Sequence, residues 1–409
     1  MRKELVLILA VALALRLYML GAESLWVDEA FTLHAAKMPV LEIIKYAATA
    51  DFNPPFYFIF MHFWTFFSTA EFWIRIPSVI FGVATVYVIS QLDFGNWRLA
   101  HASAALLAIS PFWVGYSQDA RMYSMLGFFV CLSFYFMRRN SFMYVVCAIL
   151  MLYTHVFGFF VLIAQFLFVK KRDFIIPLVF FSPWALVLLG KVSGGFWLQK
   201  PTIGLLGSSI FQLAGSAVFC VLILAGFFYS FRSRMVLYSW LFLPFMISLG
   251  ISLFFPIFLV KYISVSSFPL FFLVAGSIFL FPARVRYVLI LLVVFFSLTH
   301  VFWYFETVDN EDWRSAARFV DERSMPGDTV VFSPGYSQLA FDYYSKADLK
   351  KIQLGNTTRI NASVTGERIW LVELEGPNYD YERSFFNSLS YNNSISTNFT
   401  KIEINLFSN

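Results

Sequence analysis

Residues 5–20 read LVLILAVALALRLYML, a stretch apolar enough to lie inside a membrane as a helix. Residues 76–92 and 288–298 are runs of the same kind. A helix needs roughly 17–25 apolar residues to cross about 30 Å of hydrocarbon, so each run is a candidate span. Residues 5–20 follow Arg2 and Lys3, as in a signal peptide. No small-residue cleavage site follows them and many apolar runs do, so we interpret this run as a retained helix.

The composition of the whole chain is that of a membrane protein. Hydrophobic residues make up 59% of the 409 residues and charged residues 13%, whereas a soluble domain is roughly half apolar and a quarter charged. The formal net charge of +5 does not predict a nucleic-acid partner, because the positions of basic residues in a membrane protein matter more than their sum. The cysteines lie in apolar runs without metal-ligand spacing, which predicts packing and no disulfide framework. They are Cys131, Cys147 and Cys220.

Basic residues mark every second connection between the apolar runs, and short loops rich in Lys and Arg stay in the cytoplasm. The basic connections contain Arg2-Lys3, Arg98, Arg138-Arg139, Lys170-Lys171-Arg172, Arg232 with Arg234, and Arg284 with Arg286. This alternation predicts about eleven transmembrane helices, with the N-terminus cytoplasmic and the C-terminus extracytoplasmic. The predicted spans are residues 4–20, 75–93, 98–114, 121–137, 141–154, 156–169, 174–190, 209–230, 235–255, 263–281 and 287–304.

Residues 54–69 are also apolar, but counting them as a span would invert every basic loop that follows. Their prolines and aromatic rings favour a short interfacial or re-entrant helix. The first external loop therefore covers residues 21–74. After residue 304 charged, Asn, Ser and Gly residues become frequent.

Residues 305–409 are predicted to form a small α+β domain outside the membrane. Its pattern contains a helix at 312–323, a turn at 326–328 and strands at 329–332 and 369–373. Four Asn-x-Ser/Thr sequons are compatible with an external location; they begin at Asn356, Asn361, Asn392 and Asn398. The predicted fold is an all-α polytopic membrane domain, residues 1–304, followed by this α+β domain.

Ionisable residues gather at the predicted external ends of helices, where they require partners or a wet cavity. Asp28 and Glu29 directly follow the first span. Neighbouring helical residues project about 100° apart, so one carboxylate would react and the other would brace. The alternative is a pair of acids that only stabilises a helix N-terminus.

Asp51, Asn53 and Tyr57 form a second polar group around Pro54-Pro55. Paired prolines start a helix and hold the preceding chain in place, so Asp51 and Asn53 would have defined positions. The alternative is that Asn53 only caps this helix.

A third group, Gln118, Asp119, Arg121 and Tyr123, lies at the next external junction. Asp119 and Tyr123 would share a helix face, whereas Arg121 would point away unless the turn is irregular. The alternative is a local Asp–Arg surface pair. Further external candidates are Arg75, His155, Lys261 and Tyr262.

These motifs, in this order, resemble those of GT-C membrane glycosyltransferases, in the branch related to protein mannosyltransferases and the aminoarabinose transferase of lipid A. Each motif is weak alone, and four in order at one membrane face are specific. The resemblance covers residues 1–345 and is strongest in the first 125. The four motifs are LWVDEAF at 25–31, DFNPPFY at 51–57, RIP at 75–77 and SQDARMY at 117–123. The start of the outer domain adds DWR at 312–314, PGD at 326–328 and FDYY at 341–344.

The resemblance implies a polyprenyl- or dolichyl-phosphate sugar as donor and inverting transfer on the extracytoplasmic face. Asp28 is then the candidate base, and Glu29 and Asp119 complete the catalytic candidates. A base takes the proton of the acceptor hydroxyl, which contributes about 10²–10⁴-fold, and a cation stabilises the leaving phosphate. The candidate cations are Arg75, Arg121 and Lys261, and Lys261-Tyr262 matches a place where relatives have Arg-Tyr. The expected substrate-binding residues are Asp51, Asn53, Tyr57, Arg75, Gln118, Arg121, Tyr123, His155, Lys261 and Tyr262.

The resemblance leaves the acceptor open, as a lipid, a glycan or a protein, because the outer domain is smaller than in larger relatives. Some relatives bind a divalent metal, for which Glu29, Asp51 and His155 are candidate ligands, although no motif requires one. The alternatives are a transporter or flippase of lipid-linked substrates, an oligosaccharyltransferase and an assembly protein with a degenerate site. A transporter is disfavoured because the ionisable residues gather at one face and no internal repeat is visible.

Overall fold

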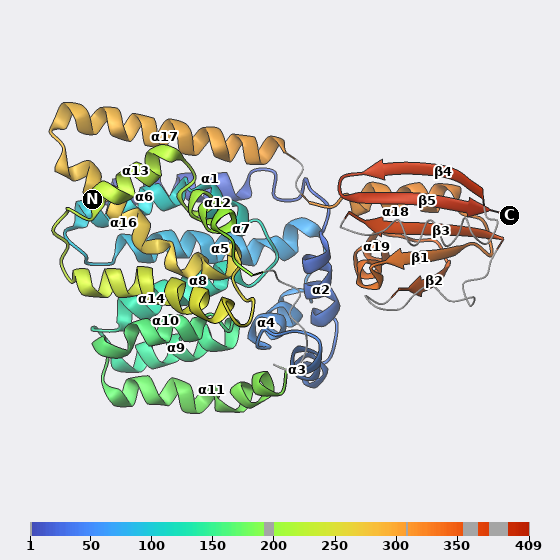
Figure 1. Ribbon diagram of the computed structural model, residues 1–409, viewed down its shortest axis with the longest axis horizontal. Helices are drawn as coiled ribbons and strands as arrows, with labels where there is room; N and C mark the ends of the chain where they lie inside the picture. Colours follow the sequence, from blue (N-terminus) through green and yellow to red (C-terminus); the bar gives the residue numbers. More distant parts are fainter. Residues whose placement is uncertain (1, 192–199, 308–309, 355–366, 376–391, 409) are drawn as a thin grey trace. The chain divides into compact units, whose positions relative to one another are not determined.

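The computed structural model describes residues 2–191, 200–307, 310–354, 367–375 and 392–408 (Figure 1). The chain divides into two compact units. We call the first the helical unit; it comprises Met1–Leu20 and Met38–Glu306. We call the second the α+β unit; it comprises Gly21–Lys37 and Thr307–Asn409. The α+β unit thus contains part of the predicted first external loop. The predicted division of the chain at residues 304/305 assigns that loop to the membrane domain instead.

Helices build the helical unit, most of them at the predicted apolar runs. They are α1 (Arg2–Leu17), α3 (Val40–Thr49), α4 (Phe56–Trp64), α5 (Glu71–Ser90), α6 (Trp97–Ala108), α7 (Pro111–Tyr116), α8 (Tyr123–Phe136), α9 (Ser141–Thr154), α10 (Gly158–Gln165), η1 (Phe166–Phe168), α11 (Lys171–Lys191), α12 (Ile203–Ala214), α13 (Ala217–Gly226), α14 (Arg234–Ser252), α15 (Val260–Ile263), η2 (Ser264–Ser266), α16 (Phe268–Leu280) and α17 (Ala283–Glu306).

Four helices in the described part of the chain, α5, α11, α14 and α17, are long and apolar enough to cross a membrane. The number rises to six if α12 with α13, bent by 87°, and residues 260–280, bent by 55°, each count as one span. Figure 1 shows the four long helices running nearly parallel. Helices α8, α9 and α10 are apolar but shorter. The chain is therefore a multi-pass membrane protein, and the count of eleven spans stays a prediction.

The breaks between helices have local causes in the sequence. The run predicted at 98–114 divides into α6 and α7 at Ser110-Pro111, where Ser110 caps the new helix and proline at its first position lacks only an amide that would be unpaired. The 87° bend between α12 and α13 occurs at Gly215, whose φ of +78° is a conformation that favours glycine. Breaks of this kind shorten several runs below the usual length of a span.

Helix α4 has nine residues, and at about 1.5 Å per residue it is too short to cross a bilayer. This agrees with the prediction that residues 54–69 do not form a span. Asn53 does not cap the helix, because the residue before its first turn is Pro55 and no side chain accepts there. The capping alternative for Asn53 is therefore wrong.

The α+β unit contains a five-stranded sheet in the order β2-β1-β3-β5-β4. Strands β2 and β3 pair in parallel with β1, and β5 pairs antiparallel with both β3 and β4. The elements are α2 (Val27–Ala36), α18 (Trp313–Arg323), β1 (Thr329–Ser333), η3 (Gly335–Ser337), α19 (Gln338–Tyr344), β2 (Lys350–Gln353), β3 (Arg368–Leu374), β4 (Asn392–Phe399) and β5 (Ile402–Ser408).

This unit confirms the predicted α+β class, together with its helix and its two strands. Asp312 caps α18 by accepting from the backbone amide of Ser315 at 3.1 Å. Gly327, in the predicted turn, has a φ of +95°. Of the sequons, Asn398 is exposed on β4 and Asn392 begins that strand. Asn356 and Asn361 lie outside the described residues.

Apolar residues of α2 belong to the core of the α+β unit. Val27 and Ala30 are buried in one cluster with Trp313, Trp370 and other residues of α18, α19 and the sheet. Phe31 packs against the edge of the same cluster. Burial of these side chains provides the driving force that holds α2 in this unit.

Candidate active site

The two candidate carboxylates lie in the first turn of α2, as the sequence predicts. Glu29 is fully buried, whereas Asp28 is partly exposed. The helix begins after Trp26, whose side chain cannot cap it. The amide of Val27 instead donates to the Oε2 atom of Glu311 at 2.8 Å. Glu311 is a residue that sequence reasoning missed, because nothing in the local pattern links it to a helix far away in the chain.

In the helical unit, four elements bring aromatic side chains around His155. The ring centroid of His155 lies 6.0 Å from that of Tyr123, 5.5 Å from Phe157 and 5.2 Å from Tyr262. These residues come from the start of α8, the connection between α9 and α10, and α15. Tyr116, at the end of α7, extends the group through a contact of 5.2 Å with Tyr123.

Two cationic side chains adjoin this aromatic group. The Nζ atom of Lys261 lies 5.7 Å from the ring centroid of Tyr123 and 5.9 Å from that of Tyr262. The charges of Arg121 and Lys261 both act on the imidazole of His155. Arg121 is 6% exposed. We call Arg121, Tyr123, His155, Lys261 and Tyr262 the cationic–aromatic cluster.

His155 is a neutral hydrogen-bond donor in this cluster. It follows the last residue of α9 and lies outside the predicted spans on either side. Burial, and then the charges of Arg121 and Lys261, lower the pKa of its imidazole to about 3. Its Nδ1 atom accepts from the amide of Phe157 at 3.1 Å. The proton of the neutral ring is therefore on Nε2, which is buried and meets no hydrogen-bond acceptor among the described residues.

Arg121 and Asp119 lie in an irregular turn, residues 117–122, between α7 and α8. The expected helix face shared by Asp119 and Tyr123 is wrong, because α8 begins only at Tyr123. Two neighbouring helices hold the turn. Gln118 Nε2 donates to the carbonyl of Tyr18 at 2.7 Å, and Ser78 Oγ donates to that of Asp119 at 2.6 Å. Gln118 thus has a positioning contact in the structure.

Arg16 supports the same turn from within α1. Its guanidinium is 1% exposed and donates to Ser117 Oγ at 3.1 Å and to the carbonyl of Ala108 at 2.9 Å. Gly82 of α5 leaves room for this contact, because a Cβ atom there would collide with Ser117 and press on Arg16. The signal for Arg16 is visible in the sequence as a charge within an apolar run, since such charges are retained for a specific role.

Asp51 and Asn53 form a local turn before α4. The Oδ1 atom of Asp51 accepts from the backbone amide of Asn53 at 2.8 Å and from its side chain at 3.0 Å. Lys191, at the end of α11, donates to the carbonyls of Ala47 and Asp51. Like Arg16, Lys191 is a buried or partly buried cation that the sequence analysis did not select.

The two remaining helical-unit candidates are buried. Tyr57 is 1% exposed in α4, and Arg75 is 3% exposed in α5. The Nη1 atom of Arg75 donates to the carbonyl of Leu20 at 2.9 Å. Arg75 thus fixes the chain where it leaves the first predicted span.

Among the residues that the structure describes, no three His, Cys, Asp or Glu side chains are grouped so that they could hold a metal ion. Of the candidate ligands, Glu29 belongs to the α+β unit, and Asp51 and His155 belong to the helical unit.

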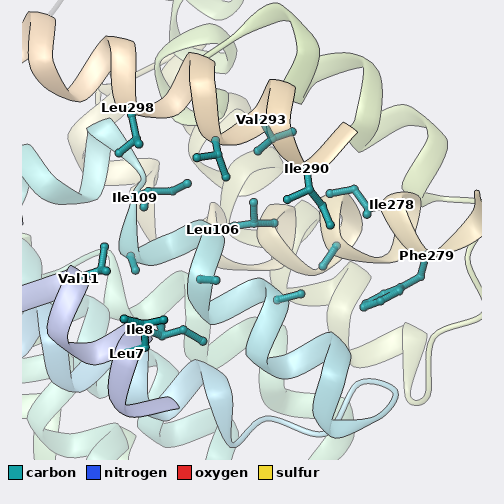
Figure 2. A pocket seen from close by; sticks show the side chains of 15 residues that line it. Leu7, Ile8, Val11, Leu106, Ile109, Ile278, Phe279, Ile290, Val293 and Leu298 are labelled. Carbon is teal, nitrogen blue, oxygen red and sulfur yellow. The ribbon is translucent and has the colours of Figure 1, made fainter. Parts of the chain in front are cut away.

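A groove of about 480 Å³ lies among α1, α6, α16 and α17 of the helical unit (Figure 2). Every side chain that lines it is apolar. Figure 2 shows Leu7 and Val11 of α1 on one side and Val293 and Leu298 of α17 on the other. A surface of this kind accommodates a hydrocarbon chain and offers nothing to a polar ligand.

These features define a class of protein: a polytopic membrane protein with the GT-C fold and a small α+β unit. The fold matches that of ArnT from Cupriavidus metallidurans, solved bound to undecaprenyl phosphate, with a TM-score of 0.62 and 12% identity over 98% of this chain and 97% of that one. The apo form of ArnT gives a TM-score of 0.62 with 13% identity over the same shares.

A second protein of known structure is also similar. The arabinofuranosyltransferase AftD from Mycobacteria matches with a TM-score of 0.52 and 13% identity, over 100% of this chain and 41% of that one. Identities this low establish the fold alone. No known sequence family and no curated protein sequence matches the chain.

Proposed function

We propose that the protein is a membrane glycosyltransferase that transfers a sugar from a polyprenyl- or dolichyl-phosphate-linked donor to an acceptor on the extracytoplasmic face. The observation that carries the proposal is the cationic–aromatic cluster, in which the charges of Arg121 and Lys261 act on the neutral imidazole of His155, a combination of groups suited to binding a phosphate. The fold supports it, because ArnT has been solved bound to undecaprenyl phosphate and AftD is an arabinofuranosyltransferase. The acceptor is a lipid, a glycan or a protein.

The cluster suits the phosphate of such a donor by charge and by hydrogen bonding. A phosphodiester carries one negative charge, which Arg121 and Lys261 would balance in a setting where water screens little. His155 would add a hydrogen bond from its Nε2 atom, which has no hydrogen-bond partner among the described residues. These groups stabilise the phosphate further as it gains charge on leaving the sugar, so they favour the transition state over the bound donor.

The rings of Tyr116, Tyr123 and Tyr262 would contact the apolar face of the sugar, with their hydroxyl groups available for hydrogen bonds. The apolar groove in Figure 2 offers room for several isoprene units of the carrier lipid. Asp51, Asn53, Tyr57 and Arg75 stay proposed substrate-binding residues.

In the proposed reaction, Asp28 takes the proton of an acceptor hydroxyl as its oxygen attacks the anomeric carbon. The bond from that carbon to the phosphate oxygen breaks, and the phosphate leaves with the electron pair. One displacement inverts the anomeric configuration. Glu29 follows Asp28 in the sequence and is fully buried; in this proposal it holds Asp28 in position. Asp119 belongs to the donor half of the site.

The test is transfer by the purified full-length protein in lipid nanodiscs. Polyprenyl-phosphate sugars labelled in the sugar are supplied one at a time with a membrane extract as the source of acceptor. We expect one donor to label a component of the extract, with inversion seen by NMR of the product, and Asp28→Asn to slow labelling by about 100-fold. Failure of every donor with folded protein would refute the proposal. Movement of intact donor across proteoliposomes would instead support the flippase alternative.

A further inference from the structure

We propose that Glu311 is a positioning residue for Asp28, because its carboxylate holds the first turn of α2 from a distant part of the same unit. The Oε2 atom of Glu311 accepts from the amide of Val27 at 2.8 Å and from the indole Nε1 of Trp313 at 2.8 Å. Val27 directly precedes Asp28. The proposal rests on the function proposed above for Asp28, and the contact itself is independent of that function.

Glu311 supplies a cap that α2 lacks locally. The first amides of a helix have no partner within the helix, and a Ser, Thr, Asn or Asp side chain usually serves one of them. The residue before α2 is Trp26, whose side chain makes no cap hydrogen bond. A carboxylate at this end also interacts favourably with the helix dipole. Glu311 therefore combines a charge-assisted hydrogen bond with a favourable dipole interaction.

Hydrogen bonds also hold the chain that precedes α2. Ser24 Oγ donates to the backbone carbonyl of Glu311 at 2.5 Å. The amide of Leu25 donates to the hydroxyl of Tyr344 at 2.7 Å, and Arg314 Nη1 donates to the carbonyl of Ala22 at 3.1 Å. Because these partners all lie in the α+β unit, contacts within that unit hold the chain where α2 starts.

Glu311 and Asp28 are also coupled by charge. Partial burial raises the pKa of Glu311, the hydrogen bonds from Trp313 and Val27 oppose this, the charge of Asp28 raises it further and Lys401 lowers it. The charges of Glu311 and Asp28 both help to raise the pKa of Tyr336. The titratable groups that interact with Glu311 are therefore Asp28 of α2, Tyr336 of η3 and Lys401 of the β4–β5 turn. Loss of the charge on Glu311 would make Asp28 a weaker base, since a neighbouring negative charge favours protonation.

The coupling has a pH dependence whose sign follows from the hydrogen bond of Val27, which favours the ionised form of Glu311 and so lowers its pKa. Ionised Glu311 caps the helix more strongly than the protonated acid. The cap is therefore complete above the folded-state pKa of Glu311 and weakens as the pH falls through it. Removing the charge of Asp28 lowers that pKa, so the cap should then persist to lower pH.

Hydrogen exchange of the full-length protein in nanodiscs tests the contact without any assay of activity. We expect Glu311→Ala to speed intrinsic-rate-corrected exchange in residues 25–31 by about fivefold, the change that corresponds to the typical ~1 kcal/mol of a lost cap. In the wild type this protection should fall with decreasing pH. Asp28→Asn should move the midpoint of that fall to lower pH, and Glu311→Gln should remove the dependence. Glu367→Gln, an exposed matched control in the same unit, should change neither.

The link to the reaction is tested with the donor that supports transfer by the wild type. Glu311→Gln, which keeps the length and one acceptor, should lower turnover and move the acid limb of the pH–rate profile to lower pH, with donor affinity unchanged. Wild-type exchange in Glu311→Ala, or an unmoved midpoint in Asp28→Asn, would overturn the proposal. If no donor supports transfer, the proposed function fails, and the exchange data still decide whether Glu311 holds and senses the first turn of α2.

Discussion

Replacing His155 separates the two roles that its ring nitrogens have in the structure. Nδ1 accepts from the amide of Phe157, and Nε2 carries the proton that we expect to face the donor phosphate. The amide of asparagine reaches the place of Nδ1, so His155→Asn keeps the local contact and loses the donor. The amide of glutamine reaches the place of Nε2, so His155→Gln keeps the donor.

The expected loss follows from the charge of the acceptor. A hydrogen bond to a charged group contributes about 1.5–3 kcal/mol, and each 1.4 kcal/mol is a tenfold change in affinity. His155→Asn should therefore weaken binding of the polyprenyl-phosphate sugar by about 10- to 100-fold, and His155→Gln should recover most of it. His300→Asn is the control, since the Nδ1 atom of His300 lies 2.8 Å from the carbonyl oxygen of Phe296 within α17 and the residue is outside the cationic–aromatic cluster.

The same experiment has a pH arm, because the pKa of His155 is lowered to about 3. The ring stays neutral from pH 5 to 8, and the phosphodiester keeps one charge over that range. Donor affinity in the wild type should therefore be constant, measured by equilibrium binding of labelled donor in nanodiscs. A binding site that used charged His155 would lose affinity as the pH rises through about 6–7. That result, or equal affinities of the two His155 variants, would contradict the assigned role.

Three further predictions follow from the same structure. Asp28→Asn should bind donor normally while turnover falls by about 100-fold, the scale for losing a general base. Glu29→Gln should slow the chemical step less. Near-native turnover in Asp28→Asn would exclude Asp28 as the base. Arg121→Ala should weaken donor binding more than it lowers protein abundance, since the turn is held by contacts to its backbone and by Gln118, and wild-type affinity would reduce Arg121 to a structural role. A reporter fused after Leu406 should register outside and one within residues 138–140 inside, and the opposite result for either would reverse the predicted topology.

Local patterns in the sequence were sufficient for part of the fold. Apolar run lengths predicted the membrane class, and the helical and strand periodicities at 312–323, 329–332 and 369–373 match α18, β1 and β3. These features depend on contacts between near neighbours along the chain and on the solvent around them. The same reasoning failed at residues 117–122, because tertiary contacts from α1 and α5 hold an irregular turn where spacing alone favours a helix.

The tertiary structure alone decided which candidates meet. His155, Tyr123 and Tyr262 are far apart in the sequence, and their clustering results from packing between helices, which residue type does not encode. The placement of α2 in the α+β unit, with Glu311 as its cap, likewise depends on burial of Val27 and Ala30 against Trp313. The sequence by itself determined the membrane setting and the candidate residues, since both follow from local composition. The structure decided their partners, because a long-range contact gains its energy only when distant segments bury surface together.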